Sequence, residues 1–190
     1  MTAYTDIGLC SKALLKLGAT SIASFEDGTA EAEISSNLYP LIRDGLLSSY
    51  PWSFALTQTT LGRLYESPQA DYAYAYQLPN DMLRIISAGS YSRGRGIEYC
   101  IKENRLHTDS ENVVLTYIFR PAENSFPAFF CDALVARLTA EFCLPLTESS
   151  SRAEFLYKRA EEEIKKARLT DAQQATPKRF EDFSLTEVRL

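Results

Sequence analysis

Apolar side chains recur at steps of three and four residues in the first quarter of the chain, which is the period of an amphipathic helix. One such stretch covers residues 5–17, where Thr5 can cap the start and Gly18 can end the helix. A second stretch begins near Thr29 and runs to Pro51, which breaks it. The pattern therefore predicts two N-terminal helices.

The same period returns in the last third of the chain. A third helix is predicted to begin at Pro127 and to be stopped by Pro145. A fourth is predicted to begin at a capping box made by Ser151 and Glu154, and to continue to about residue 169.

Between these helices the period changes toward two, which is typical of strands. Tyrosines alternate with alanines from Tyr72 to Tyr76, and Pro79 begins a turn. The glycine-rich run 87–96 is predicted to be a mobile loop. Short strands are expected at residues 72–76, 83–86, 97–101, 105–107 and 113–119.

These elements predict an α+β fold that is mainly α. Residues 1–56 and 121–169 would form a bundle of about four helices, and residues 57–120 an antiparallel β insertion between the second and third helix. Residues 170–190 would form an extended C-terminal arm.

The arm has no helical stripe, yet it keeps large apolar side chains that a purely solvated tail would rarely retain. We interpret residues 177–190 as a docking arm, because large apolar groups in pockets dominate interface energies. An arm folded back on its own subunit or crossing to a neighbour is the alternative. The predicted anchors are Phe180, Phe183, Leu185, Val188 and Leu190.

Several other residues are interpreted as structural anchors. Trp52, the only tryptophan, and Phe54 follow the second helix and are expected in the core, although stacking on a sugar or base is an alternative. Tyr76 is expected on a half-buried sheet face, or on a ligand platform. Pro79 and Asp81 are expected in a turn, where the Asp81 carboxylate would accept hydrogen bonds from turn amides.

Composition indicates an ordinary globular protein of 190 residues with a net charge of −5, which argues against a broad phosphate-binding surface. The four cysteines lack the short spacing of a metal or redox motif, so no metal and no cofactor are expected. No apolar run approaches the ~20 residues of a membrane span, so no membrane partner is expected.

A search for catalytic groups yields weak candidates. The single histidine, His107, has no nucleophile near it in sequence, and the arginines of 93–96 are more typical of a solvated loop tip than of a nucleic-acid contact. Asp81 and Glu98 are the least poor carboxylate pair for a hydrolase. We assign no catalytic residue and predict a structural protein, not an enzyme.

Four segments, in this order, resemble the head-to-tail adaptor proteins of short-tailed phages, often called tail tubular protein A. The richest carries Tyr39-Pro40, Arg43-Asp44, Leu47 and Pro51-Trp52-Ser53-Phe54-Ala55. The others are Leu9–Ala19, Tyr74–Ile85 and Phe130–Thr147, so that the resemblance covers most of residues 7–147.

The resemblance implies a homo-oligomeric ring, of twelve copies, below the portal protein of the capsid. Such a ring extends the channel through which DNA passes and carries a distal, nozzle-type tail protein. It implies a place in the virion tail, after assembly in the host cytoplasm. Two alternatives stay open: a tail-associated peptidoglycan hydrolase, and a stopper or tail-completion connector protein.

Overall fold

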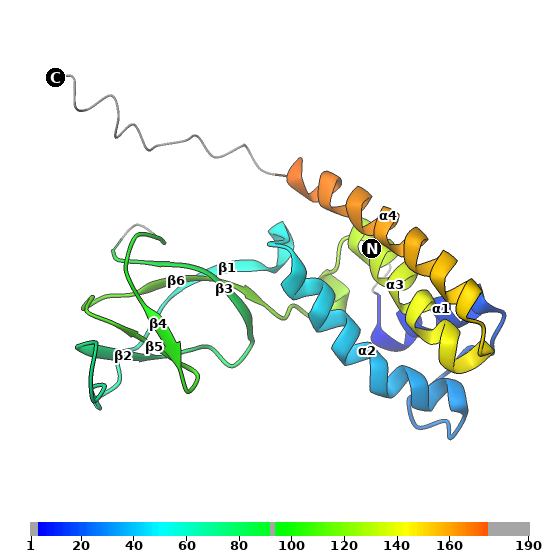
Figure 1. Cartoon of the computed structure of the whole chain (residues 1–190), viewed down its shortest axis with the longest axis horizontal. Helices are drawn as coiled ribbons and strands as arrows, with labels where there is room; N and C mark the ends of the chain where they lie inside the picture. The colour runs from blue at the N-terminus through cyan, green and yellow to red at the C-terminus, as the bar shows by residue number, and fades with distance from the viewer. Residues whose placement is uncertain (1–3, 92–93, 175–190) are drawn as a thin grey trace.

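The computed structural model of the protein describes residues 4–91 and 94–174. Four helices gather at one end of an elongated molecule and the strands form a separate unit at the other end (Figure 1). The strands come between the second and third helix in the chain. The predicted fold class, α+β and mainly α with an antiparallel insertion, is confirmed.

The first two helices begin at the expected caps. Helix α1 spans Asp6–Leu17, and the Thr5 hydroxyl accepts a hydrogen bond from the third amide of the helix. Gly18 ends α1 with a φ of 81°, a conformation in which glycine carries no steric penalty. Helix α2 spans Ala30–Ser49 and is capped by Thr29, with Pro40 inside it.

Helix α3 spans Ala128–Thr147, so the expectation that Pro145 stops it is wrong. A proline in the last turn removes only one backbone hydrogen bond, and the helix continues for two more residues. It ends where Glu148 turns left-handed, with a φ of 52°, and donates its amide to the carbonyl of Leu144 at 2.9 Å.

Helix α4 spans Ser150–Ala172, and both predicted limits need correction. The capping hydroxyl belongs to Ser149, not to Ser151, and it accepts from the amide of Arg152 at 3.4 Å. The helix also continues three residues past 169, because a tertiary contact of Asp171 described below holds its last turn. The segment 170–190 is therefore helical at its start, and residues 175–190 lie outside the described residues.

The insertion contains two three-stranded antiparallel sheets, with the orders β1–β6–β3 and β2–β5–β4. The strands are β1 (Leu56–Thr60), β2 (Tyr74–Gln77), β3 (Met82–Gly89), β4 (Cys100–Lys102), β5 (Arg105–Thr108) and β6 (Val114–Phe119). The expected loop 87–96 is wrong in its first three residues, because β3 pairs with β6 up to Gly89. The expected strand 97–101 is wrong in both limits, since β4 begins at Cys100 and ends at Lys102, and Tyr72 lies outside β2.

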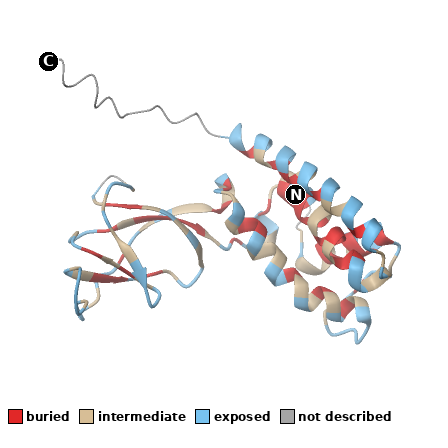
Figure 2. Ribbon diagram, in the orientation of Figure 1, coloured by how far each residue is buried: buried red, intermediate tan, exposed pale blue. Residues whose placement is uncertain are grey.

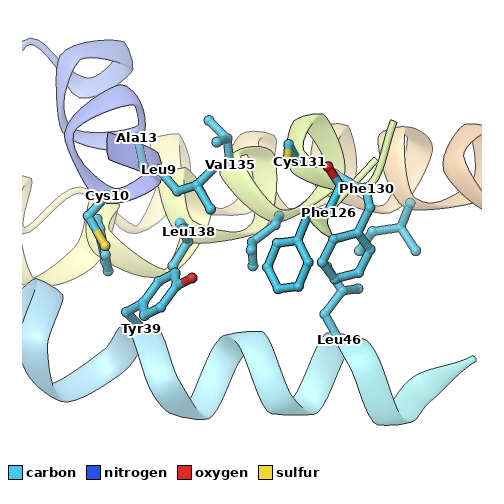
Figure 3. Packing of buried hydrophobic residues seen from close by; sticks show 14 of the residues in the cluster. Leu9, Cys10, Ala13, Tyr39, Leu46, Phe126, Phe130, Cys131, Val135 and Leu138 are labelled. Atoms are coloured by element: carbon cyan, nitrogen blue, oxygen red, sulfur yellow. Dashed lines mark hydrogen bonds between the residues drawn. The ribbon is translucent and has the colours of Figure 1, made fainter. Parts of the chain in front are cut away.

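Burial divides the molecule into two apolar clusters (Figure 2). The larger fills the space between the helices, where Tyr39 and Leu46 of α2 point toward Phe126, Phe130 and Leu138 (Figure 3). The smaller lies between the two sheets. Strand β6 belongs to both, since Ile118 packs in the helical cluster while Leu115 and Tyr117, on the other face of the strand, pack in the β cluster.

Candidate interaction surface

The segment that leaves α2 is fastened by aromatic packing. Trp52 is fully buried, and its indole Nε1 donates to the carbonyl of Leu46 at 3.0 Å. Its ring meets Tyr50 and Phe130 edge-on, with centroids 5.0 and 5.1 Å apart. Phe54 is half-buried against the same Phe130 at 4.9 Å. Trp52 therefore has no exposed surface with which to stack on a sugar or base, and Phe54 packs against the rings of Trp52, Phe126, Phe129 and Phe130.

A chain of charged groups joins α2 to the segment between β6 and α3. Arg43 donates from Nη1 to Oε1 of Glu123 at 2.8 Å and from Nε to Oδ1 of Asp44 at 2.9 Å. Arg120 donates from Nη2 to Oδ2 of Asp44 at 2.6 Å, and Tyr39 donates its hydroxyl to Glu123 at 3.1 Å. The Arg43-Asp44 pair of the resembled motif therefore fixes the β unit to the bundle.

The contacts at this junction decide the protonation states of Asp44, Glu123 and Tyr39. Burial by itself would raise the pKa of Asp44 and of Glu123, but the hydrogen bonds and charges of the arginines outweigh it and hold both carboxyl pKa values below their usual range. The pKa of the Tyr39 hydroxyl is raised, first by burial and then by Glu123. Both acids stay ionised over the whole neutral range, as a structural ion pair requires.

A second fastening joins the end of α4 to the short 3-10 helix Ser53–Ala55 that precedes β1. Asp171 is buried, and its two carboxylate oxygens accept the backbone N–H of Ser53 at 3.1 and 3.0 Å. Its Oδ1 also accepts the Ser53 hydroxyl at 2.7 Å. The point at which the chain leaves α4 is therefore fixed beside the Trp52 segment.

An apolar groove runs between α2 and α4, over α3, with a volume of ≈ 470 Å³. We call it the α2–α4 groove. Leu41 stands at its edge with 72% of its surface exposed, and Ile164 lies buried in its floor. Two arginines and two glutamates complete the groove: Arg137, which pairs with Glu141 at 2.7 Å, together with Glu161 and Arg168. Its full lining is Leu38, Leu41, Ile42, Gly45, Leu46, Ser49, Arg137, Glu141, Glu161, Ile164 and Arg168.

The bundle has further exposed apolar residues on α1 and α4. Leu15 is 61% exposed and lines a smaller groove of ≈ 230 Å³ between α1 and α3. Phe155 of α4 is 64% exposed. Lys16 lies on the edge of this groove and of another one that Leu156 and Arg159 of α4 line. This basic, apolar surface and the α2–α4 groove have no residue in common.

The remaining predicted anchors lie in the β unit. Tyr76 is buried, and its hydroxyl donates to the carbonyl of Ser110 at 2.7 Å. Pro79 is half-buried. The expected role of Asp81 needs correction, because its carboxylate is exposed and accepts the hydroxyl of Tyr117 at 3.4 Å, while its own backbone carbonyl accepts the amide of Arg120.

The weak catalytic candidates are not brought together into a cleft. Asp81 and Glu98 are both exposed, and neither lines any of the grooves described here. His107 is half-buried on β5, at a shallow polar hollow of ≈ 410 Å³. Its partner in register on β4 is Cys100, a pairing that the two-residue turn Glu103–Asn104 fixes.

The glycine-rich loop lies against the sheet. The carbonyl of Gly94 accepts the hydroxyls of Ser87 at 2.7 Å and Thr116 at 3.3 Å. A Cβ at residue 94 would come within 2.6 Å of side-chain atoms of Gln58 and Thr116, so only glycine fits without a shift. Gly94 is half-buried and held against β6, whereas Arg95 beside it is exposed.

Three of the cysteines behave as small apolar groups. Cys10, Cys131 and Cys143 are buried. Burial raises the pKa of the Cys10 thiol to about 12 and that of Cys131 to about 11, which removes the reactive thiolate at neutral pH. Cys100 is half-buried.

Within residues 4–91 and 94–174, no three His, Cys, Asp or Glu side chains gather in a way that could hold a metal ion. No helix in the same part of the chain is long and apolar enough to cross a membrane. The predicted anchors Phe180 to Leu190 fall outside the described residues. Neither the protein-family models nor the curated proteins gave a match to this chain.

Proposed function

We propose that this protein is a structural head-to-tail adaptor of a short-tailed phage. The observation that carries the proposal is the junction between the strands and the helices, where the residues of the strongest resemblance lie: Arg43 and Asp44 pair with the segment that follows β6. Trp52 packs the segment that leads into β1 against the bundle. A ring subunit has to span from one neighbour in the tail to the next as a stiff body. The two fastenings and the elongated shape suit that task (Figure 1).

The bundle also offers what a closed ring needs. Subunits in a ring present two different surfaces to their neighbours, in a heterologous contact. The α2–α4 groove and the basic, apolar surface of α1 and α4 are two such surfaces. In the proposed assembly the bundles pack side by side against the portal, and the β unit faces the distal tail protein or its neighbours.

The ring, of twelve copies, would extend the DNA channel below the portal in the virion. DNA carries one negative charge per ~1.7 Å of its axis, so a strongly basic lumen would hold it back. A subunit with a net charge of −5 suits a passage that DNA crosses without being bound.

The decisive experiment mixes the full chain with its cognate portal protein and counts subunits by native mass spectrometry and electron microscopy. We expect a ring of adaptor copies on each portal particle. Portal particles that remain bare at saturating protein would overturn the proposal. Binding to a completed adaptor ring instead of the portal would favour the stopper or tail-completion alternative.

Deleting residues 177–190 tests the docking arm. We expect the shortened subunit to keep its helical signal in far-UV circular dichroism and to lose attachment to portal particles. Normal attachment would remove the role of Phe180, Phe183 and Leu185 as portal anchors.

No hydrolase activity is proposed, because Asp81 and Glu98 lie exposed and outside the described grooves. A zymogram on peptidoglycan with the purified protein checks this, and a cleared band that persists in the Asp81→Asn, Glu98→Gln double variant would point to another site.

A further inference from the structure

We propose that residues 175–190 of the free subunit occupy the α2–α4 groove of the same chain, with Phe180 and Phe183 against its apolar floor. The proposal concerns the subunit before any assembly and does not depend on the adaptor function. It names an intramolecular occupant for a surface that the described residues leave open.

The groove has the chemistry of a binding surface for an apolar segment. Leu38, Leu41 and Ile42 line its α2 side, and Ile164 faces them from α4. Single exposed leucines are normal on a protein surface, but Leu41 belongs to a continuous hollow of ≈ 470 Å³. Burying this surface against phenyl rings would remove apolar area from water, which is favourable.

One polar atom at the groove lacks a partner among the described residues. Nε of Arg168 is shielded from solvent and makes no hydrogen bond in the described part of the chain. The rest of the guanidinium is held in place, because Nη2 donates to the hydroxyl of Ser49 at 3.3 Å and the group lies 5.6 Å from the ring centre of Tyr50. A shielded N–H without an acceptor is unfavourable. A backbone carbonyl of the segment that precedes Phe180 would supply the acceptor.

Residues 175–190 follow the C-terminal end of α4, which lies close to the Arg168 end of the α2–α4 groove. Arg168 lies one turn before the end of α4, and Asp171 fixes that end to Ser53. Ile164 lies ten residues before Gln174, which is about 15 Å of helix. Six extended residues from Gln174 to Phe180 span about 20 Å, so Phe180 reaches Ile164 when the chain turns back. Phe183, three extended residues further on, would lie about 10 Å beyond Phe180 along the groove that Leu41 also lines.

A segment of the same chain has an advantage over a neighbouring copy. A short tether gives it an effective concentration in the millimolar range, far above that of free subunits in a dilute solution. The α2–α4 groove and the apolar side chains of residues 175–190 would then shield each other from solvent. A partner that binds either of them, such as a portal or a second subunit under the proposed function, would first have to displace the other.

Cysteine cross-linking tests the contact in the full chain. In a Cys100→Ser background, Leu41→Cys is combined with Phe183→Cys and the protein is oxidised mildly at low micromolar concentration. We expect a disulfide within the monomer, visible as a shifted monomer band without reductant. The matched control combines Phe183→Cys with Leu15→Cys, which is similarly exposed but lies on α1. We expect its yield of monomeric cross-link to be at least tenfold lower.

A labelling experiment checks the same contact without the disulfide. The rate at which a maleimide modifies Leu41→Cys should rise at least fivefold when Phe180 and Phe183 are both replaced by serine, while the rate at Leu15→Cys stays unchanged. Equal cross-linking yields for both pairs, cross-links that form only between chains, or an unchanged labelling rate would each overturn the proposal. None of these results bears on portal binding, which has its own assay above.

Discussion

The helical bundle and the β unit are held together in different ways. The bundle buries a continuous cluster of aromatic and aliphatic side chains around α3, among them Trp52, Phe130 and Phe142. The β unit has a far smaller cluster between its sheets and relies on hydroxyl groups that bind its loops. Tyr76 binds the carbonyl of Ser110, and Thr108 binds that of Glu98 at 2.6 Å.

This difference predicts how each region opens. Loss of packing in the bundle should unfold the whole molecule, because burial provides most of its stability. Regions with few buried contacts and many polar loop contacts open locally at lower free energy. The β unit should therefore exchange its amide hydrogens faster than the bundle, except at β6, which belongs to both clusters.

The largest effect is expected from Trp52→Ala. The substitution leaves a cavity among Tyr50, Phe54 and Phe130 and removes the donor for the carbonyl of Leu46. We expect a loss of about 3–5 kcal/mol in the free energy of unfolding, measured by urea titration with far-UV circular dichroism. Trp52→Phe should recover a large part of it. A loss below about 1 kcal/mol would mean that the bundle does not depend on this residue.

Arg43→Met should lower the free energy of unfolding by less than Trp52→Ala does. This variant tests how firmly the β unit is coupled to the helical bundle. The variant leaves Glu123 without its charged partner and removes one partner of Asp44. We expect a cost of about 2–3 kcal/mol. Amide exchange should speed up in the β unit more than in α3. The matched control is Arg84→Met, an exposed arginine of β3, which should change neither. Uniformly faster exchange would contradict a coupling role.

Gly94→Ala should lower the free energy of unfolding by less than Arg43→Met does, and it should destabilise the β unit alone. The new methyl group would meet Gln58, whose amide can swing aside, and Thr116, which sits on a buried part of β6. We expect a loss of about 1–2 kcal/mol. Gly62→Ala is the control, since nothing lies within 4 Å of a Cβ at that position. Equal melting temperatures for the two variants would show that the loop is free to move away.

The smallest expected effect is the loss of folding stability at low pH that comes from Asp44 and Glu123. The folded pKa values of Asp44 and Glu123 are depressed, so the stability that they contribute is present above their unfolded pKa values, near 4. It is lost as the pH falls through the lower folded values. Between pH 5 and pH 2.5 the parent protein should lose more stability than Arg43→Met does. Parallel curves for the two proteins in urea titrations would show that these carboxyls are not stabilised by Arg43.

The regions also differ in how far the sequence predicts them. The limits of α1 follow from Thr5 and Gly18, because a helix repeats every 3.6 residues and its caps are local. Strand β1 is less visible, since Leu56–Thr60 has no alternation of apolar and polar residues and is defined by its pairing with β6. The start of α4 falls in a run of three serines, any of which could cap it.

The junction could be predicted only in part. Arg43 and Asp44 stand in a recognisable motif, but Arg120 and Glu123, which complete the ion pairs, lie more than seventy residues away in the chain. No local pattern links groups at that distance. The same holds for Asp171, whose partner Ser53 lies on the other side of the entire β unit in the sequence. Contacts of this kind decide where α4 ends and how the two regions are joined.

The carboxylate of Asp171 has a mechanical consequence. A pull on the chain beyond residue 174 meets three hydrogen bonds to Ser53 before it can unwind α4 from its end. Tension would therefore pass to the Trp52 segment and into the middle of the molecule, where bundle and sheet meet. A pulling force on the C-terminal segment would therefore reach the junction of the two regions while the last turn of α4 stays folded.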